Sequence, residues 1–407
     1  MILAKSFKQL SPNSRIVTPS RSLFLSFCLI LCNATGTPRT AREVAVPAIS
    51  NGPTSSLGAH YLLLVNTAIA RQLKPQDISA FDKSPYDGLA IAFHYNYDTA
   101  PVFSAESLSS QFREWKTLTK KNLWPWVYIN RMLGAGEAAT NERVDVPYFH
   151  KIRGIDLDDK TGARTDFLQI WKTNLSVAKE MHSPGIVFDP EFYNDHKAYD
   201  PAEMARETGK SPDQLVDQLK ALGAEMADSA AGQYPNGVLW FCFTGFTHKD
   251  FKTIGGKSYY PTPVYIAIGL LDRIQQRGYG LRVISGGEGS IGYCHETLVT
   301  FQEAIDRRAA SFAPILKKYD GILELAGTLT LWDDRANKSG FVGEGDCAKA
   351  SASTIEDLQP YLELMMHKYR YNWIYGSTNG GYFAFDPQRN SRIHKVISNA
   401  QAKSNSD

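Results

Sequence analysis

Short apolar runs alternate with longer amphipathic stretches along the chain from His60 onward. The apolar runs are five to seven residues long and mostly end at small or polar residues, as strands do. They lie at 61–65, 88–93, 124–129, 185–189, 237–243, 281–285, 321–326 and 371–375. The pattern predicts alternating βα units and therefore a parallel sheet.

The stretches between the strands have the length and periodicity of helices. We expect helices near 105–120, 166–181, 211–230, 263–276, 296–318, 354–369 and 390–401. The clearest start is Ser211-Pro212-Asp213, an N-cap followed by Pro at the first helical position. Eight units of this size favour a closed barrel over a doubly wound open sheet. We therefore predict an α/β fold, a single-domain (β/α)8 TIM barrel over residues 59–407.

The segment before the barrel has the composition of a targeting sequence. Four basic residues precede the apolar run 23–32, and no acid occurs before Glu43. Such a run is short for a membrane span and typical of a signal-peptide core. We expect a signal peptide over 1–34, cleaved after Ala34, and hence a secreted or periplasmic protein without stable membrane insertion. A lipid anchor on Cys32 and an uncleaved anchor are the alternatives.

Composition bears on the linker, on disulfide bonds and on the class of ligand. Residues 35–58 are rich in Thr, Pro, Ala, Ser and Gly, which is typical of a linker or an N-terminal arm. The formal net charge of +2 gives no electrostatic reason to expect nucleic acid. Only three Cys remain after leader cleavage, so no disulfide framework organises the fold. The aromatic share of 12% favours a ligand with flat apolar faces, such as a sugar.

The predicted strand at 185–189 carries the most informative residues. Asp189 and Glu191 stand two positions apart, so their side chains share a face with Val187. Pro190 cannot donate to a ladder, so regular pairing should end there. Two acids on one face disfavour each other's ionisation, which is one way to tune a general acid.

Polar and aromatic residues follow the other predicted strands, and in a barrel these strand ends form one rim. The expected substrate contacts are His94, Tyr95, Asn96, Asn130, Arg131, Tyr193, Tyr293, Trp332 and Asp333. The chain has no His/Cys zinc spacing, no Gly-x-Ser-x-Gly and no Walker loop. We therefore expect no metal and no cofactor. Carboxylates beside aromatic platforms favour cleavage of glycosidic bonds, with a carbohydrate as the partner.

Glu288 is the first candidate for a second carboxylate. It shares a face with Arg282 and Ile284 by period two, which places it at the rim of the sixth strand. The glycines at 286, 287 and 289 are expected to leave space there for a ligand.

Three other acids compete with Glu288 for this role. Asp189 is close to Glu191 in sequence, and Asp333 lies beyond the seventh strand. Glu324 also lies on the seventh strand, but early in it, so its side chain should point into the barrel below the rim. We expect Glu324 to form a buried ion pair with Arg282.

The stretch 185–193 resembles the fourth-strand signature of the chitinase-like glycoside hydrolases, Gly-Ile/Phe-Asp-hydrophobic-Asp-x-Glu-Tyr. Val187 stands where that family has a further Asp. The resemblance implies that Glu191 is the general acid/base and that Asp189 orients it. Acids on the fourth and sixth strands also look like those of α-galactosidase-like barrels, which would make Asp189 the nucleophile and Glu288 the proton donor.

These observations predict a glycoside hydrolase that cleaves an oligo- or polysaccharide by carboxylate acid/base catalysis. Glu191 is the expected acid/base, and Glu288 or Asp189 is the expected second carboxylate. A saccharide-binding barrel without catalysis and a polysaccharide lyase with a Tyr or His base are the alternatives.

Overall fold

The structure is a computed structural model of the 407-residue chain. It describes residues 60–93, 105–132, 155–192, 196–246, 252–254, 256–292, 295, 297–331, 356–376 and 384–405. The expected signal peptide and the expected linker or arm lie outside these ranges and stay predictions.

Eight parallel strands close into a barrel in the order β1-β10-β9-β8-β5-β4-β3-β2. They are β1 Tyr61–Ile69, β2 Gly88–Ala92, β3 Asn122–Tyr128, β4 Gly185–Asp189, β5 Val238–Phe241, β8 Arg282–Ser285, β9 Leu323–Leu331 and β10 Tyr371–Gly376. The barrel fold and all eight predicted strands are confirmed. Each barrel strand pairs with the next barrel strand along the chain, and β10 pairs with β1 and closes the ring.

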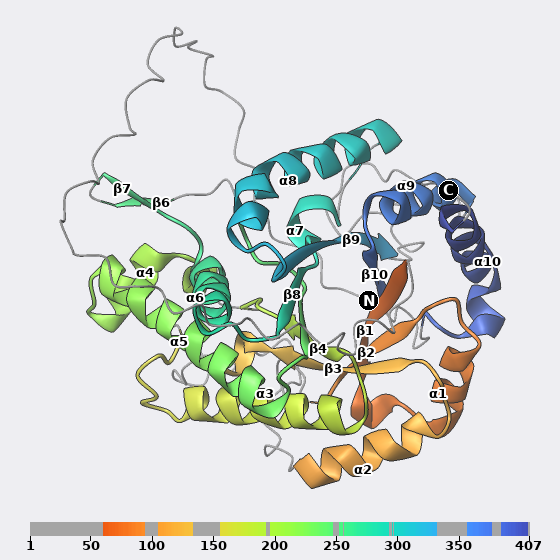
Figure 1. The fold of residues 1–407 in the computed structure, drawn as a ribbon, viewed down its shortest axis with the longest axis horizontal. Helices are drawn as coiled ribbons and strands as arrows, with labels where there is room; N and C mark the ends of the chain where they lie inside the picture. The colour runs from red at the N-terminus through yellow and green to blue at the C-terminus, as the bar shows by residue number, and fades with distance from the viewer. Residues whose placement is uncertain are drawn as a thin grey trace, which may run out of the picture. The chain divides into compact units, whose positions relative to one another are not determined.

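Helices surround the strands (Figure 1). They are α1 Pro75–Asp82, α2 Ala105–Lys116, α3 Ala163–Glu180, α4 Pro201–Thr208, α5 Pro212–Gln233, α6 Thr262–Arg277, α7 Glu288–Ile291, α8 Leu298–Lys318, α9 Gln359–Lys368 and α10 Pro387–Ser404. The predicted start of α5 is confirmed, because Ser211 and Gln214 form a reciprocal capping box. The sequence pattern missed α1, α4, α7 and a hairpin of β6 (Lys252–Ile254) and β7 (Lys257–Tyr259).

Aromatic side chains fill the inside of the barrel. Trp126, Val187, Trp240 and Ile284 pair in register across four neighbouring strands. All four belong to one buried interior cluster, together with Trp124, Trp373, Tyr61 and Tyr371. Rings meet edge-on or tilted, as in the pair Trp124–Trp240 with 5.8 Å between centroids. The interior is therefore a packed core and the carboxyl ends of the strands form the mouth.

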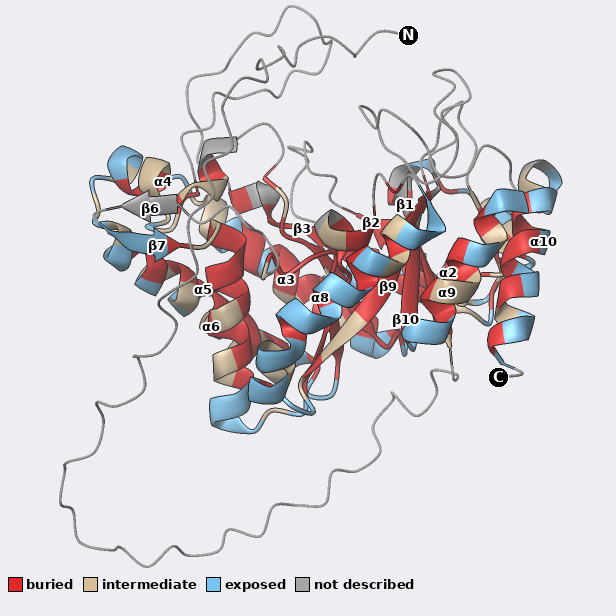
Figure 2. Cartoon of the chain, turned by 90° about the horizontal axis from the view of Figure 1, so that it is seen from above, coloured by how far each residue is buried: buried red, intermediate tan, exposed pale blue. Residues whose placement is uncertain are grey.

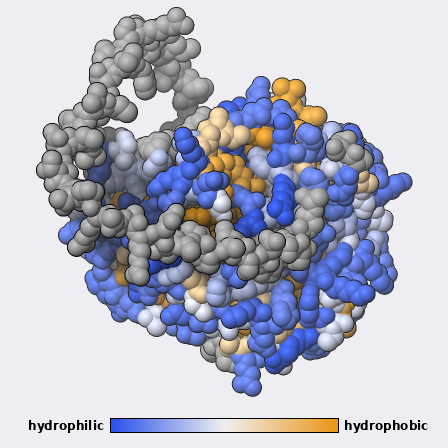
Figure 3. Space-filling view, in the orientation of Figure 1, coloured by the Kyte–Doolittle hydropathy of each residue, from blue (hydrophilic) through white to orange (hydrophobic). Residues whose placement is uncertain are grey.

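Alternate residues of each strand face outward and pack under the helices. Ile186 and Phe188 join a cluster that includes α3 and α5, whereas Val187 between them faces inward. The strands and the inner faces of the helices are buried, and the outer faces are exposed (Figure 2). Hydrophilic residues dominate the described surface on the side seen in Figure 3. In the described ranges, no helix has the length and apolar character needed to cross a membrane.

Candidate functional site at the barrel mouth

Asp189 ends β4 and caps the backbone that follows it. Its Oδ1 accepts a hydrogen bond of 2.9 Å from the backbone N–H of Glu191. Only 2% of Asp189 is exposed, while Glu191 is half-buried. Val187 lies in the barrel interior one inward position earlier, as the alternation predicted. The strand therefore buries Asp189 at the mouth and carries Glu191 just beyond the last paired residue.

Cys242 lies between the acids of the fourth and sixth barrel strands. Its N–H donates to the Phe188 carbonyl over 2.9 Å, and its own carbonyl accepts the Glu288 N–H over 3.2 Å. Burial raises the pKa of the Cys242 thiol well above its ordinary value, and the carboxylates of Asp189, Glu288 and Glu191 raise it further. The two backbone hydrogen bonds therefore place Cys242 between the end of β4 and the start of α7.

Glu288 reaches the rim by a turn and not by an extended strand. The strand β8 ends at Ser285, and Glu288 is the first residue of the short helix α7. Gly287 before it has the left-handed φ of 80°, which a side chain would disfavour. Only 8% of Glu288 is exposed. The period-two extrapolation thus gave the right end of the barrel but the wrong local backbone.

The expectation that small glycines leave room for a ligand is wrong at two positions. A Cβ on Gly286 would lie 2.5 Å from the Cys242 carbonyl oxygen and 2.8 Å from Nε1 of Trp373. A Cβ on Gly287 would overlap the guanidinium of Arg308. These glycines allow close packing of backbone and side chains that come from distant parts of the chain.

The substitution Gly286→Ala should therefore destabilise the barrel. We expect the free energy of unfolding in urea to fall by about 1–3 kcal/mol, because the added methyl overpacks a filled site. The matched control is Gly232→Ala in α5, where a Cβ would meet nothing within 4 Å. That change should leave stability unaltered or raise it by about 0.5–1 kcal/mol. Equal stabilities for the two variants would contradict this account.

Tyr199 is a residue at the mouth that the sequence analysis missed. It ends the 3-10 turn His196–Tyr199, and its hydroxyl oxygen accepts the Phe192 N–H over 2.8 Å. Burial raises its pKa far above the ordinary value, and the carboxylates of Glu191, Asp189 and Glu288 raise it further. The hydroxyl therefore stays protonated at neutral pH. The only signal for Tyr199 in the sequence was that an aromatic residue stands ten positions after the end of β4.

Replacing Tyr199 by Phe should lower the free energy of unfolding by about 1–3 kcal/mol, because the Phe192 N–H loses its acceptor. Thermal unfolding of the variant and of the wild-type chain measures the effect. An unchanged stability of Tyr199→Phe would contradict this account.

Glu324 is paired, as expected, away from the mouth. Its carboxylate forms an ion pair with Arg282, whose Nη2 also donates to the Tyr371 hydroxyl over 3.1 Å. Both residues lie at or near the start of their strands, so the pair sits at the end of the barrel opposite Glu191 and Glu288. The pairing is confirmed, but the expected burial is wrong, because 21% of the Arg282 side chain and 35% of the Glu324 side chain are exposed. This position disfavours Glu324 as the second carboxylate.

Two of the nine predicted substrate contacts lie in the described residues. Asn130 and Arg131 belong to the 3-10 turn Ile129–Met132 directly after β3, so their backbone lies at the mouth. The remaining ones lie outside the described residues: His94, Tyr95, Asn96, Tyr193, Tyr293, Trp332 and Asp333. Their roles stay predictions.

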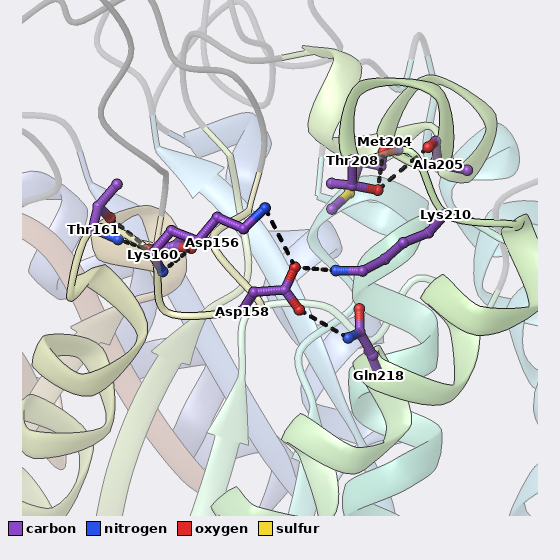
Figure 4. Close-up of polar contacts among 9 residues, drawn as sticks. All are labelled: Asp156, Asp158, Lys160, Thr161, Met204, Ala205, Thr208, Lys210 and Gln218. Carbon is purple, nitrogen blue, oxygen red and sulfur yellow. Dashed lines mark hydrogen bonds and ion pairs between the residues drawn. The ribbon is translucent and has the colours of Figure 1, made fainter.

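In a second acidic segment, which precedes α3, the carboxylates of Asp156 and Asp158 bond other residues of the chain (Figure 4). Asp156 accepts hydrogen bonds from the backbone N–H groups of Lys160 and Thr161 over 2.8 and 2.7 Å. Asp158 pairs with Lys210, which lowers the pKa of that carboxyl. These bonds join the segment before α3 to the start of α5. Within the ranges that the structure describes, no three His, Cys, Asp or Glu side chains form a metal-binding group.

Comparisons with known proteins come from structure alone, since neither a protein-family model nor a curated protein matches the chain. A GH5 family lichenase from Caldicellulosiruptor sp. F32 is 10% identical, covers 86% of this chain and 96% of its own, and has a TM-score of 0.48. A GH18 chitinase from Pseudoalteromonas aurantia is 12% identical, covers 84% of this chain and 99% of its own, and has a TM-score of 0.40. A sugar phosphate isomerase/epimerase from Parabacteroides distasonis ATCC 8503 is 8% identical, covers 88% of this chain and 99% of its own, and has a TM-score of 0.39. At such identities and scores the likeness extends no further than the barrel fold.

Proposed function

We propose that this protein is a glycoside hydrolase that acts at the mouth of its barrel. The observation that carries the proposal is that three acids stand at neighbouring strand ends: Asp189 and Glu191 at the end of β4, and Glu288 after β8. The strands β4 and β8 flank β5, and Cys242 after β5 bonds the backbone of both Phe188 and Glu288. Acids placed close together disfavour each other's ionisation, which is one way to tune a general acid. Glycosidic-bond cleavage needs a proton donor of this kind together with a second, ionised carboxylate.

Glu191 is the proton donor in this proposal. It protonates the glycosidic oxygen while the bond from that oxygen to the anomeric carbon breaks. Glu288 either attacks the anomeric carbon or takes a proton from the water that attacks it. Water finally supplies the new hydroxyl on the sugar and the proton that restores Glu191. A separation of about 5–5.5 Å between the two carboxyl groups would favour retention, and about 6.5–9.5 Å would favour inversion.

Asp189 and Tyr199 support this pair. Asp189 is almost fully buried and already bonds the Glu191 backbone, so we assign it to positioning Glu191. Tyr199 holds Phe192 by the same kind of contact and adds a hydroxyl proton for a sugar or its leaving group. Both residues fix the backbone on either side of Glu191, which keeps the donor in place before substrate binds.

The test is to incubate the purified chain with a panel of soluble polysaccharides and oligosaccharides, including β-glucans and chito-oligosaccharides. New reducing ends without ultraviolet-absorbing unsaturated ends support hydrolysis. Unsaturated ends would identify a lyase instead. Saccharide binding seen by calorimetry without any product would leave a binding barrel and refute the proposed reaction.

A further inference from the structure

A groove lies at the amino-terminal end of the barrel, away from the candidate site at the mouth. The helices α3 and α5 end there, just before β4 and β5 begin. The groove has a volume of about 650 Å³, which is within the usual range for small-molecule sites. Five residues line it: Ser176, Lys179, Glu180, His182 and Tyr234. The proposed reaction uses none of them.

The turn after α3 places an unusual residue in the left-handed conformation. His182 has a φ of 52°, and its N–H donates to the Lys179 carbonyl over 3.2 Å. The N–H of Ser183 donates to the Ala178 carbonyl over 2.9 Å. These two bonds form a Schellman motif, in which the left-handed residue is usually Gly. A side chain disfavours that conformation, so His182 costs stability at this position.

Two other helices of the chain end in the same motif with Gly. Gly209 after α4 has a φ of 69°, and Gly278 after α6 has a φ of 63°. In both, the next N–H donates to the carbonyl five positions earlier, over 3.0 and 3.1 Å, as that of Ser183 does. At His182 the chain instead keeps a less favourable residue, and its side chain lines the groove. Backbone strain of this kind is common where a side chain serves a ligand.

Other parts of the chain hold the aromatic and acidic walls of the groove in place. The Tyr234 hydroxyl donates to the Ser183 carbonyl over 2.8 Å, which joins the end of α5 to the turn after α3. Glu180 accepts the Ser109 hydroxyl over 2.5 Å and forms an ion pair with Arg113. Nevertheless, 43% of the Glu180 side chain is exposed. An aromatic surface and an acceptor are therefore fixed before a ligand binds.

Lys179, His182 and Ser176 supply donors to the groove. The first two side chains are exposed, and in the described part of the chain neither has an ion pair or a side-chain hydrogen bond. Lys179 in the last turn already complements the helix dipole, so that role does not explain His182. A simple anion would need only donors. Donors and acceptors beside an aromatic ring instead suit the hydroxyls and apolar faces of a sugar.

We propose that this groove is a second saccharide-binding site, which holds a stretch of the polymer away from the barrel mouth. The choice of a saccharide rests on the proposed hydrolase function. The His182 imidazole and the Glu180 carboxylate bond sugar hydroxyls, and Tyr234 contacts a sugar face. Such a site adds binding energy for a long polymer without taking part in bond cleavage.

Binding is tested on the full chain, labelled with ¹³C in the His and Tyr rings. The His182 signal is assigned by its loss in His182→Gly, and the Tyr234 signal by its loss in Tyr234→Phe. We expect both to shift saturably when cellohexaose or chitohexaose is added. In His182→Gly, the Kd read from Tyr234 should rise by about three- to tenfold, because one hydrogen bond is lost.

Two results of this titration would overturn the proposal. The first is the absence of a saturable shift with either oligosaccharide. The second is a saturable shift with inorganic phosphate alone, since the groove would then be an anion site.

Stability separates a binding role of His182 from a structural one. Gly adopts the left-handed conformation freely, so His182→Gly should melt at or above the wild-type temperature while it binds saccharide more weakly. A lower melting temperature with an unchanged Kd would show that His182 only supports the turn. Such a result would overturn its role in binding.

Two further variants complete the design. Ser176→Leu removes a hydroxyl and fills part of the groove, so it should also raise the Kd. If His182→Gly does not fold, an unchanged Kd in Ser176→Leu overturns the proposal. The control is His367→Gln, because His367 is an exposed His in the last turn of another helix, α9. The Kd and the melting temperature should not change in that variant.

The same chain distinguishes this proposal from the proposed function. Hydrolysis of a saccharide without a saturable shift of His182 would refute the second site and leave the proposed function standing. A saturable shift of His182 in a chain that hydrolyses no saccharide would support the second site and refute the proposed function.

Discussion

Replacing Glu191 by Gln is expected to lower kcat/KM on a natural saccharide by about 10²–10⁴-fold, the usual contribution of a positioned general acid. Gln has nearly the same shape, so the Asp189 bond to the backbone of residue 191 should survive. What is lost is the proton for the leaving oxygen. Activity should therefore fall much less on aryl glycosides with acidic leaving groups, which depart without protonation. Rates on the two substrate types measure the difference.

An exposed acid provides the control for Glu191→Gln. Glu114 lies on the outer face of α2, so Glu114→Gln should behave like wild type on both substrate types. Near-normal activity of Glu191→Gln on the natural saccharide would refute its role as acid. An equal loss on both substrates would instead indicate that Glu191 acts on the sugar and not on the leaving group.

Replacing Glu288 by Gln is expected to lower kcat/KM by at least about 10³-fold, and equally for good and poor leaving groups. The reason is that every substrate needs the second carboxylate at the anomeric carbon. In a retaining enzyme, azide should restore turnover to Glu288→Ala by taking the place of the missing carboxylate and leaving as a glycosyl azide. Chromatography of the products and initial rates with and without azide measure both effects.

The outcome for Asp189 decides between the two candidate arrangements. With Glu288 as the second carboxylate, Asp189→Asn should cause a smaller loss, because an Asn side-chain oxygen still accepts the Glu191 N–H. If Asp189→Asn is the variant with the leaving-group-independent loss and Glu288→Gln keeps most activity, Asp189 is the nucleophile. The assignment of Glu288 as the second carboxylate would then be wrong.

The barrel was predictable because its signals are local. Each strand is a short apolar run that turn residues bound, and the helix α5 begins at a capping box that can be recognised in four residues. Elements below the length of the pattern were missed. The helix α7 has four residues and the strands β6 and β7 have three each, too few for any periodicity to register.

The site was predictable only where its residues are close in sequence. Asp189 and Glu191 could be paired because two positions on one strand share a face. Tyr199 carries no such mark, since tertiary packing alone brings it to the mouth. The same limit explains the error at Gly286, where the filling side chain, Trp373, comes from a strand 87 residues later. A small residue predicts close approach but does not say whether ligand or protein approaches.

The aromatic interior of the barrel also gives the protein an internal optical probe. Six of its seven tryptophans lie in the described residues, and all six are buried. Indole emission shifts to longer wavelength when water reaches the ring, so native fluorescence reports the integrity of the core without any added label. The rings at Trp124 and Trp240 are close enough to exchange excitation energy. The spectrum therefore follows the core as a unit and can monitor the folding of every variant discussed above.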